Sequence, residues 1–399
     1  MSKSPRLLYI DDIPTPYRLG VHRLVARRWP GPYKLLFLAG DEPGRGWDFD
    51  FTGLDVEILP GRQFRPPKQI NPFSIKWNPS IVRMIEAFRP DVVVLSGYIH
   101  PPIIRAARWC LTQRVPYAVV CETSRLSTAC SGWRWRTRRA LLGWVVRNMA
   151  FGLPVGREAA DYLQRFGPTG APMHYFPNTP DTSAIVAEAD RVHGEGRENS
   201  LRDAFGIEPE KPIVIFAGRL IDAKRPMDVL AAFERLGELG KKAALVVVGD
   251  GPLRPALVQR ARGAKVVFTG WLRDPVQMAG LMAIARVFVL PSAHEPWGAV
   301  VNEALAAGTP VIASDRVTSA VELIEAGVNG FLHPVGDVDA LSECIGTMLA
   351  LDAADRARMS GAARFTATVY GHEFAAGNLI EGALAAIGRR RDAAREIAA

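Results

Sequence analysis

A strand–loop–helix–strand pattern in the last third of the chain limits the fold most tightly. An apolar run over 287–290 is typical of a buried strand, and a polar loop that carries Glu295 follows it. Residues 298–307 then have the pattern of an amphipathic helix that contains Glu303, and a second apolar run begins at 311–313. Such a unit places both acids near the carboxyl end of a parallel sheet, where open α/β sheets bind ligands.

Two carboxylates at this edge suit a hydroxyl-rich ligand. A carboxylate accepts hydrogen bonds from adjacent hydroxyls, so Glu303 suits a ribose diol and Glu295 suits a sugar ring. Backbone N–H groups near Gly298 and Ala299 can meet a phosphate or a polarised sugar oxygen. For either acid alone, a structural role remains open. Glu295 could stabilise the N-terminus of the helix from the loop, and Glu303 could be a solvated acid on the helix surface.

The rest of the chain alternates strand-like and helix-like segments, which predicts parallel sheets with both faces covered. Residues 41–80 are rich in Pro, Gly and aromatics without a period, and they are expected to form a long irregular loop. Residues 192–200 are expected to form an exposed loop. The expected strands are 7–10, 34–39, 92–95, 117–121, 212–217, 244–248, 266–269, 287–290 and 311–313. The principal expected helices are 17–28, 79–88, 103–112, 158–166, 228–239, 275–285, 337–350 and 373–398.

Length and composition indicate a two-domain globular protein. The chain has 399 residues, of which 48% are hydrophobic and 23% charged. No segment approaches the roughly 18 consecutive apolar residues of a membrane helix, and the N-terminal apolar stretch is too short for a signal peptide. The four cysteines have neither metal-site nor disulfide-framework spacing, so a reduced cytoplasm is expected.

The positive charge is concentrated in the first half. Residues 1–180 hold 25 Lys and Arg against 13 Asp and Glu, whereas the whole chain has a net charge of +8. This excess favours an acidic partner such as an anionic lipid headgroup, a phosphorylated acceptor or a nucleic acid, with solubility as the alternative. The segment from Trp133 to Arg139 opens a basic amphipathic helix, which suits either an anionic membrane surface or a packed helix with a solvated arginine face.

Arg219 and Lys224 form a second chemical pattern. They lie between a buried strand and the helix that follows, and a cation before a helix opposes the helix dipole. Such a local inconsistency is expected at functional sites. Arg supplies a fork of donors for phosphate oxygens and Lys a mobile point charge, so together they could neutralise a diphosphate leaving group. The alternative is a surface cluster of cations.

These motifs resemble those of the family 4 glycosyltransferases. The resemblance is carried by the residues 295–298, by the pair Glu295 and Glu303 in the form Glu-x7-Glu, and by Ala307-Gly308-Thr309-Pro310-Val311. It implies the GT-B architecture, two Rossmann-like α/β domains with parallel sheets that face each other across a cleft. The expected domains are 1–182 on the acceptor side, to which a helix over 371–399 packs back, and 183–370 on the nucleotide-sugar side.

The resemblance also implies roles for individual residues. Arg219, Lys224, Glu295 and His100 are the expected catalytic residues, without a metal or a cofactor. Where relatives carry a glycine pair after the first strand, this chain has Pro14-Thr15-Pro16, and Tyr17 and Arg18 could substitute as donors. Glu122 and Arg125, at the end of another strand, join these two as acceptor candidates. Nucleotide-sugar contacts are expected from Gly218, Arg219, Lys224, Gly249, Gly270, Glu295, Trp297, Gly298, Ala299 and Glu303.

The function implied is transfer of a sugar from a nucleotide-diphosphate donor, UDP favoured and GDP open, to a hydroxyl of a saccharide or lipid-linked saccharide with retention of configuration. The basic first half suggests peripheral contact with the inner face of a membrane in surface polysaccharide or glycolipid synthesis. No nucleic-acid partner is expected, because no motif beyond charge supports one. Two alternatives remain: a nucleotide-sugar epimerase on the same fold, and a catalytically silent protein that binds membranes or nucleic acid.

Overall fold

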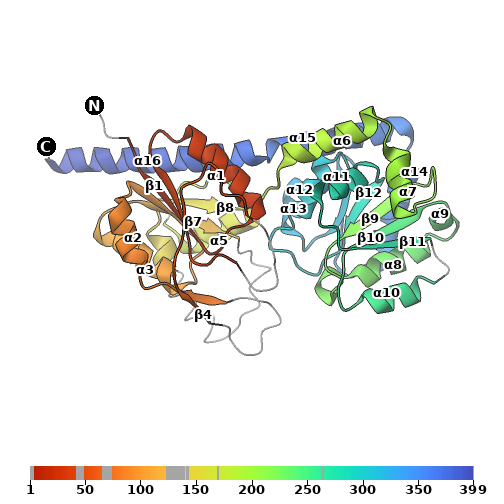
Figure 1. Ribbon diagram of the computed structural model, residues 1–399, viewed down its shortest axis with the longest axis horizontal. Coiled ribbons are helices and arrows are strands. Elements are labelled where there is room, and N and C mark those ends of the chain that lie inside the picture. Colours follow the sequence, from red (N-terminus) through yellow and green to blue (C-terminus); the bar gives the residue numbers. More distant parts are fainter. Residues whose placement is uncertain are drawn as a thin grey trace. The chain divides into compact units, whose positions relative to one another are not determined.

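The computed structural model describes residues 4–41, 49–64, 74–122, 140, 143–168, 170–262 and 265–398. The chain divides into two compact units. Unit 1 comprises Met1–Pro180 together with His372–Ala399, and unit 2 comprises Asp181–Gly371. Each unit is a parallel six-stranded sheet with helices on both faces, as the alternating sequence pattern predicts (Figure 1).

The sheet of unit 1 has the strand order β3-β2-β1-β6-β7-β8. Its central strands are almost entirely apolar, because helices cover both faces of the sheet and side chains on both sides of each strand are buried. The continuous apolar run Leu-Leu-Tyr-Ile in β1 fits this position. The strands are β1 (Leu7–Asp11), β2 (Tyr33–Phe37), β3 (Val56–Ile58), β6 (Val92–Ser96), β7 (Tyr117–Cys121) and β8 (Phe151–Pro154). The short antiparallel pair β4 (Arg62–Phe64) and β5 (Ile75–Trp77) stands apart from this sheet.

One face of this sheet packs on α1 (Pro16–Arg28) and on α16 (His372–Ala398), which lie side by side in Figure 1. The core contributed by α16 consists of buried small and apolar residues, among them Ala376, Leu379 and Ala383. The other helices of unit 1 are α2 (Ile81–Phe88), α3 (Pro101–Thr112) and α5 (Arg157–Phe166). The last segment of the chain therefore completes the core of the first domain.

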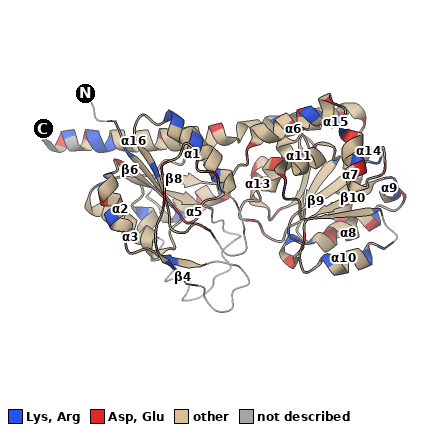
Figure 2. Ribbon diagram, in the orientation of Figure 1, with Lys and Arg blue, Asp and Glu red and all other residues tan. Residues whose placement is uncertain are grey.

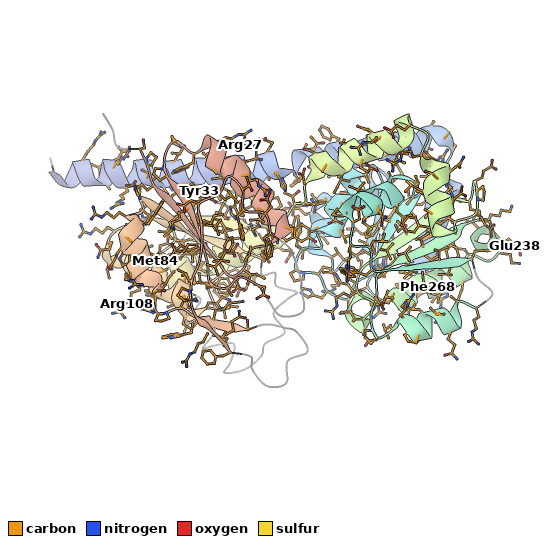
Figure 3. All side chains as sticks on the ribbon, in the orientation of Figure 1. Arg27, Tyr33, Met84, Arg108, Glu238 and Phe268 are labelled. Atoms are coloured by element: carbon orange, nitrogen blue, oxygen red, sulfur yellow. The ribbon has the colours of Figure 1, made fainter. Side chains whose placement is uncertain are left out.

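Unit 2 has the strand order β11-β10-β9-β12-β13-β14, in the same pattern as unit 1. Side chains fill the space between each sheet and its helices (Figure 3). The strands are β9 (Ile213–Ala217), β10 (Ala244–Val248), β11 (Val266–Gly270), β12 (Val287–Leu290), β13 (Val311–Ser314) and β14 (Gly330–His333). The helices include α6 (Thr182–Gly194), α7 (Glu198–Phe205), α8 (Pro226–Arg235), α9 (Glu238–Lys241), α10 (Arg254–Arg260), α11 (Pro275–Ala283), α12 (Val300–Ala306), α13 (Thr318–Leu323), α14 (Val338–Ala350) and α15 (Ala353–Val369).

Two of the expected loops are wrong in part. Residues 192–200 are mostly helical: Asp181 caps α6 by accepting a hydrogen bond from the N–H of Ala184 at 3.1 Å, and buried Glu188 pairs with Arg191 and Arg197 to hold α6 and α7 together. The Gly-rich run at 194–196 only separates the two helices. Within 41–80, the described residues include β3, which joins the main sheet, and the β4–β5 pair.

The basic run Arg389-Arg390-Arg391, near the C-terminal end of α16, belongs to unit 1. Arg389 donates to the carbonyl of Ala150 at 3.3 Å and Arg390 to that of Asp91 at 3.5 Å, near the end of α16 (Figure 2). The expected basic helix that opens at 133–139 lies outside the described residues. Across the parts of the chain that the structure describes, no helix combines the length and the apolar character needed to cross a membrane.

Candidate functional site

The sheet of unit 2 reverses its strand order between β9 and β12. The chain builds outward from β9 to β10 and β11, and then from β12 to β13 and β14 in the opposite direction. The carboxyl ends of two parallel strands that flank such a reversal leave a crevice in which ligands bind. Arg219 and Lys224 follow β9, and Glu295 follows β12, so the fold brings the two predicted motifs to this point.

Lys224 and Glu295 contact each other directly. They are 71 positions apart in the sequence, and the Nζ of Lys224 forms an ion pair with Oε1 of Glu295. Glu295 is only 8% exposed, and its Oε1 also accepts from the hydroxyl of Ser292 at 3.0 Å. Lys224 ends a single 3-10 turn, Asp222–Lys224, and the carbonyl of Ala223 accepts from the N–H of Ala293 at 2.8 Å. The loops after β9 and β12 are thus joined by both backbone and side chains.

Arg219 differs from Lys224 because its side chain is exposed. Among the described residues, no hydrogen bond or ion pair reaches its guanidinium group. Its backbone is fixed: the N–H of Gly218 donates to the carbonyl of Val248 at 3.0 Å, and that of Leu220 to the carbonyl of Asp250 at 2.9 Å. The five donors of Arg219 therefore stand on a rigid turn, where they can be used by an anion.

Glycines allow the loops after β9, β10 and β11 to touch backbone to backbone. Gly249 has φ of +129°, and a Cβ atom there would lie 2.0 Å from the carbonyl oxygen of Gly218. The N–H of Gly249 donates to the carbonyl of Gly270 at 2.8 Å. Trp271 follows and is 61% exposed, which makes it an aromatic surface beside these loops that sequence reasoning did not single out.

The loop that carries Glu295 is held by residues after β13. Thr318 donates through its hydroxyl to the carbonyl of Glu295 at 3.0 Å, and the Ser319 hydroxyl donates to that of Gly298 at 3.0 Å. Gly298 has φ of +91°, and Ala299, which follows it, is the N-cap residue of α12. Trp297 is 3% exposed, so its indole packs inside the unit and donates to Asn302 at 3.1 Å. The indole supports the loop, and only the backbone of Trp297 can meet a ligand.

Glu303 lies in the first turn of α12 and is half-buried. Burial raises the pKa of its carboxyl group to about 7. Within the described part of the chain, no hydrogen bond or ion pair reaches this carboxyl group. A half-buried carboxyl group without a partner has the properties of a group that a ligand hydroxyl would satisfy.

In unit 1, the expected acceptor residues Arg18 and Glu122 are brought together. Arg18 is buried, donates to Oε1 of Glu122 at 3.0 Å, and lies with its guanidinium carbon 4.5 Å from the ring centre of Phe176. Glu122 also accepts from Asn178 at 2.9 Å. Tyr17 is half-buried in the first turn of α1, and Arg125 lies outside the described residues.

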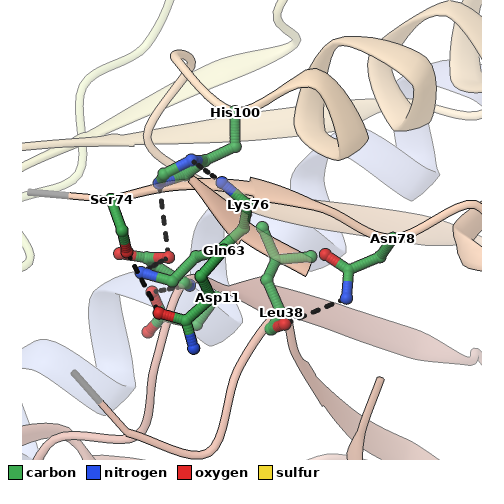
Figure 4. Close-up of polar contacts among 8 residues, drawn as sticks. Asp11, Leu38, Gln63, Ser74, Lys76, Asn78 and His100 are labelled. Atoms are coloured by element: carbon green, nitrogen blue, oxygen red, sulfur yellow. Dashed lines mark hydrogen bonds and ion pairs between the residues drawn. The ribbon is translucent and has the colours of Figure 1, made fainter. Parts of the chain in front are cut away.

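His100 is buried at the start of α3, at the end of the loop that follows β6. Its Nδ1 accepts from the N–H of Lys76 at 3.3 Å (Figure 4). Its Nε2 lies 3.2 Å from Oδ1 of Asp12. Both ring nitrogens are therefore engaged by the protein. The predicted contact between His100 and a sugar would therefore have to use the backbone of His100. Asp12 is a further polar residue at this edge, and it was not among the predicted site residues.

Comparison with known proteins agrees with this architecture. Residues 198–365 match the family described as glycosyl transferases group 1, and residues 18–179 match the glycosyl transferase 4-like domain. HepE of Anabaena, solved in complex with UDP, has the same fold with a TM-score of 0.71 at 17% identity, over 94% of this chain and 98% of that one. The chain therefore has the GT-B fold, and each of its two halves is similar to a glycosyltransferase domain.

Two named relatives show the range of this group. A GDP-mannose-dependent alpha-(1-6)-phosphatidylinositol dimannoside mannosyltransferase of Mycobacterium tuberculosis is 34% identical over 177 residues, which is 43% of this chain and 45% of that protein. The chain thus aligns with less than half of that relative's length. The sulfoquinovosyl transferase SQD2 of Arabidopsis thaliana is 26% identical over 88% of this chain and 68% of that protein.

Proposed function

We propose that the protein is a retaining glycosyltransferase that moves a sugar from a nucleotide-diphosphate donor to a hydroxyl of a saccharide or lipid-linked saccharide. The observation that carries the proposal is the contact between Lys224 and Glu295 at the point where the sheet of unit 2 reverses. On the adjoining turn, no described residue forms a hydrogen bond or an ion pair with the guanidinium of Arg219. A UDP-sugar is the favoured donor and a GDP-sugar the alternative, since HepE was solved with UDP and the mycobacterial relative is named for GDP-mannose.

In this proposal, catalysis rests on stabilising the leaving diphosphate. The bond between the anomeric carbon and the diphosphate oxygen breaks, and Arg219 and Lys224 neutralise the charge that develops on that oxygen. The acceptor oxygen attacks from the same face of the sugar, and its proton passes to the departing diphosphate. Glu295 orients the donor sugar by accepting from its hydroxyls, and Glu303 accepts from the ribose diol. No step needs a metal ion.

Binding of UDP and GDP without added metal tests the donor site. We expect calorimetry to show binding of one of the two nucleotides and a Kd about tenfold higher in Lys224→Ala, because the diphosphate would lose a cation held on a rigid turn. Lys241→Ala is the matched control, since this lysine of unit 2 pairs with Glu238 on the surface at 2.5 Å. If neither nucleotide binds, the proposed donor site is wrong.

The raised pKa of Glu303 predicts a pH dependence of nucleotide binding. At pH 8 the carboxylate is ionised and can accept from both ribose hydroxyls, whereas at pH 6, below its pKa of about 7, it is mostly protonated and accepts less well. We expect the Kd to rise about tenfold from pH 8 to pH 6 beyond the effect of the nucleotide's own titration, the size of one lost charged hydrogen bond. Glu303→Gln should remove this additional change. An identical pH profile in the variant would contradict the ribose contact.

A further inference from the structure

The sheet of unit 1 reverses its strand order between β1 and β6, as the sheet of unit 2 does between β9 and β12. Asp12 directly follows β1, and His100 stands at the end of the loop after β6. The two residues therefore flank the reversal at the carboxyl edge of the sheet, which is the place in such a fold where a ligand is expected. This observation concerns unit 1 alone.

Two buried side chains contact the carboxylate of Asp12. Lys76, which β5 carries, is 1% exposed, and its Nζ lies 2.6 Å from Oδ1 of Asp12. The Nε2 of His100 lies 3.2 Å from the same oxygen. Because Nδ1 of His100 accepts from the backbone N–H of Lys76, the ring proton of the neutral imidazole resides on Nε2 and points at Asp12.

The carboxylate of Asp12 has one engaged oxygen and one available oxygen. Its Oδ1 is buried, whereas 29% of the side chain is exposed, which leaves Oδ2 as the oxygen that faces solvent. No described residue makes a hydrogen bond or an ion pair with Oδ2. Burial by itself would raise the pKa of Asp12, but the hydrogen bond with His100 and the charge of Lys76 lower it, so the group is ionised at neutral pH.

A buried lysine is a costly way to stabilise a fold. An apolar side chain of similar size would avoid the desolvation of an ammonium group, and buried ion pairs are often replaceable by apolar residues without loss of stability. Lys76 does have a use if Asp12 must remain ionised in one orientation. The arrangement is that of a carboxylate held ready for a ligand.

Two buried cations at this edge are already matched. Lys76 contacts Asp12, and buried Arg18 pairs with Glu122 and lies in the field of buried Asp11. Among the described residues, the edge thus presents carboxylate oxygens and paired cations, in spite of the basic composition of residues 1–180. We propose that Asp12 is an acceptor-binding residue whose Oδ2 accepts a hydrogen bond from a hydroxyl, and that the reacting end of the acceptor is an uncharged polyol and not a phosphorylated group.

This inference rests on the proposed transferase function, so its test first fixes the nucleotide by calorimetry. UDP-glucose or GDP-mannose, according to the nucleotide bound, is then offered with methyl α-D-glucopyranoside, methyl α-D-mannopyranoside or myo-inositol, and separately with glucose 6-phosphate or myo-inositol 1-phosphate. Mass spectrometry follows the glycosylated products. We expect products from the uncharged polyols. Asp12→Asn should lower kcat/KM for the acceptor about a hundredfold and leave the nucleotide Kd within twofold.

Two further variants make the result decisive. Asp12→Asn removes a carboxylate that lies beside the buried ammonium of Lys76, so the double variant Asp12→Asn/Lys76→Met, which removes both charges, serves if the single one does not fold. It should show the same loss. Asp55→Asn, which removes a surface partner of Lys34 in the same unit, should leave transfer within twofold. The inference would be overturned by an unchanged kcat/KM in the folded Asp12 variants. It would also be overturned if the wild-type protein binds nucleotide but gives no product from the polyols, or gives products from the phosphorylated compounds alone. Absence of nucleotide binding would instead overturn the transferase proposal itself.

Discussion

Replacing Lys224 by Ala is expected to lower kcat by about 10² to 10³ at saturating donor, the usual effect of removing one preorganised group that stabilises developing charge. The lysine is fixed by its ion pair with Glu295 and by the 3-10 turn it ends, so no neighbouring side chain can take its place without moving that turn. Arg219→Ala should have an effect of similar size, because its guanidinium is the other cation at the strand reversal.

Transfer is measured as release of nucleoside diphosphate in the presence of acceptor, with Lys241→Ala as the surface control of the same unit. A comparison of kcat with the nucleotide Kd separates the two roles. If Lys224 contributes mainly to the transition state, kcat falls more than nucleotide affinity does. Near-normal turnover in both Lys224→Ala and Arg219→Ala would show that the diphosphate is stabilised elsewhere.

Gly249→Ala is expected to have the largest effect on folding. The added Cβ would lie 2.0 Å from the carbonyl oxygen of Gly218, and a φ of +129° is itself unfavourable for alanine. Backbone cannot rotate away as a side chain can, so the turn that carries Arg219 must move. We expect unit 2 to lose about 3 kcal/mol or more of stability, together with its nucleotide binding.

Gly361→Ala is the matched control for that substitution. Gly361 lies inside α15, and a Cβ there meets nothing within 4 Å. Alanine favours a helix interior over glycine by about 1 kcal/mol, so this variant should unfold at a higher urea concentration than the wild type and bind nucleotide equally well. Urea unfolding followed by circular dichroism measures both variants. Equal midpoints for Gly249→Ala and wild type would contradict the close approach of the two loops.

The sequence predicted those strands that are buried on both faces, because their apolar runs leave little ambiguity. It missed β8 (Phe151–Pro154) and β14 (Gly330–His333), which contain residues that argue against strands. Gly152 in β8 is explained by tertiary contact, since a Cβ there would lie 2.4 Å from the sulfur of Met173. No local pattern contains that information.

The residues that meet at the strand reversal of unit 2 could be predicted from the sequence, whereas the arrangement around Asp12 in unit 1 could not. Glu295, Lys224 and Arg219 stand in loops bounded by clear strands and helices, and the resemblance to a family linked the two motifs before the fold brought them into contact. Lys76 lies in a stretch without period and gives no signal of burial beside Asp12. An ion pair between residues 64 positions apart depends on the path of the intervening chain, which sequence reasoning described only as a long irregular loop.

The position of α16 has a consequence for the order in which the protein is made. The core of unit 1 includes Ala376, Leu379 and Ala383, which leave the ribosome only after the whole of unit 2 has been synthesised. Unit 2 is continuous in sequence and can fold while translation proceeds. Until α16 is made, the first 180 residues keep uncovered the part of their sheet that α1 does not cover. A stop codon or a proteolytic cut before α16 would thus damage the domain that the first 180 residues form.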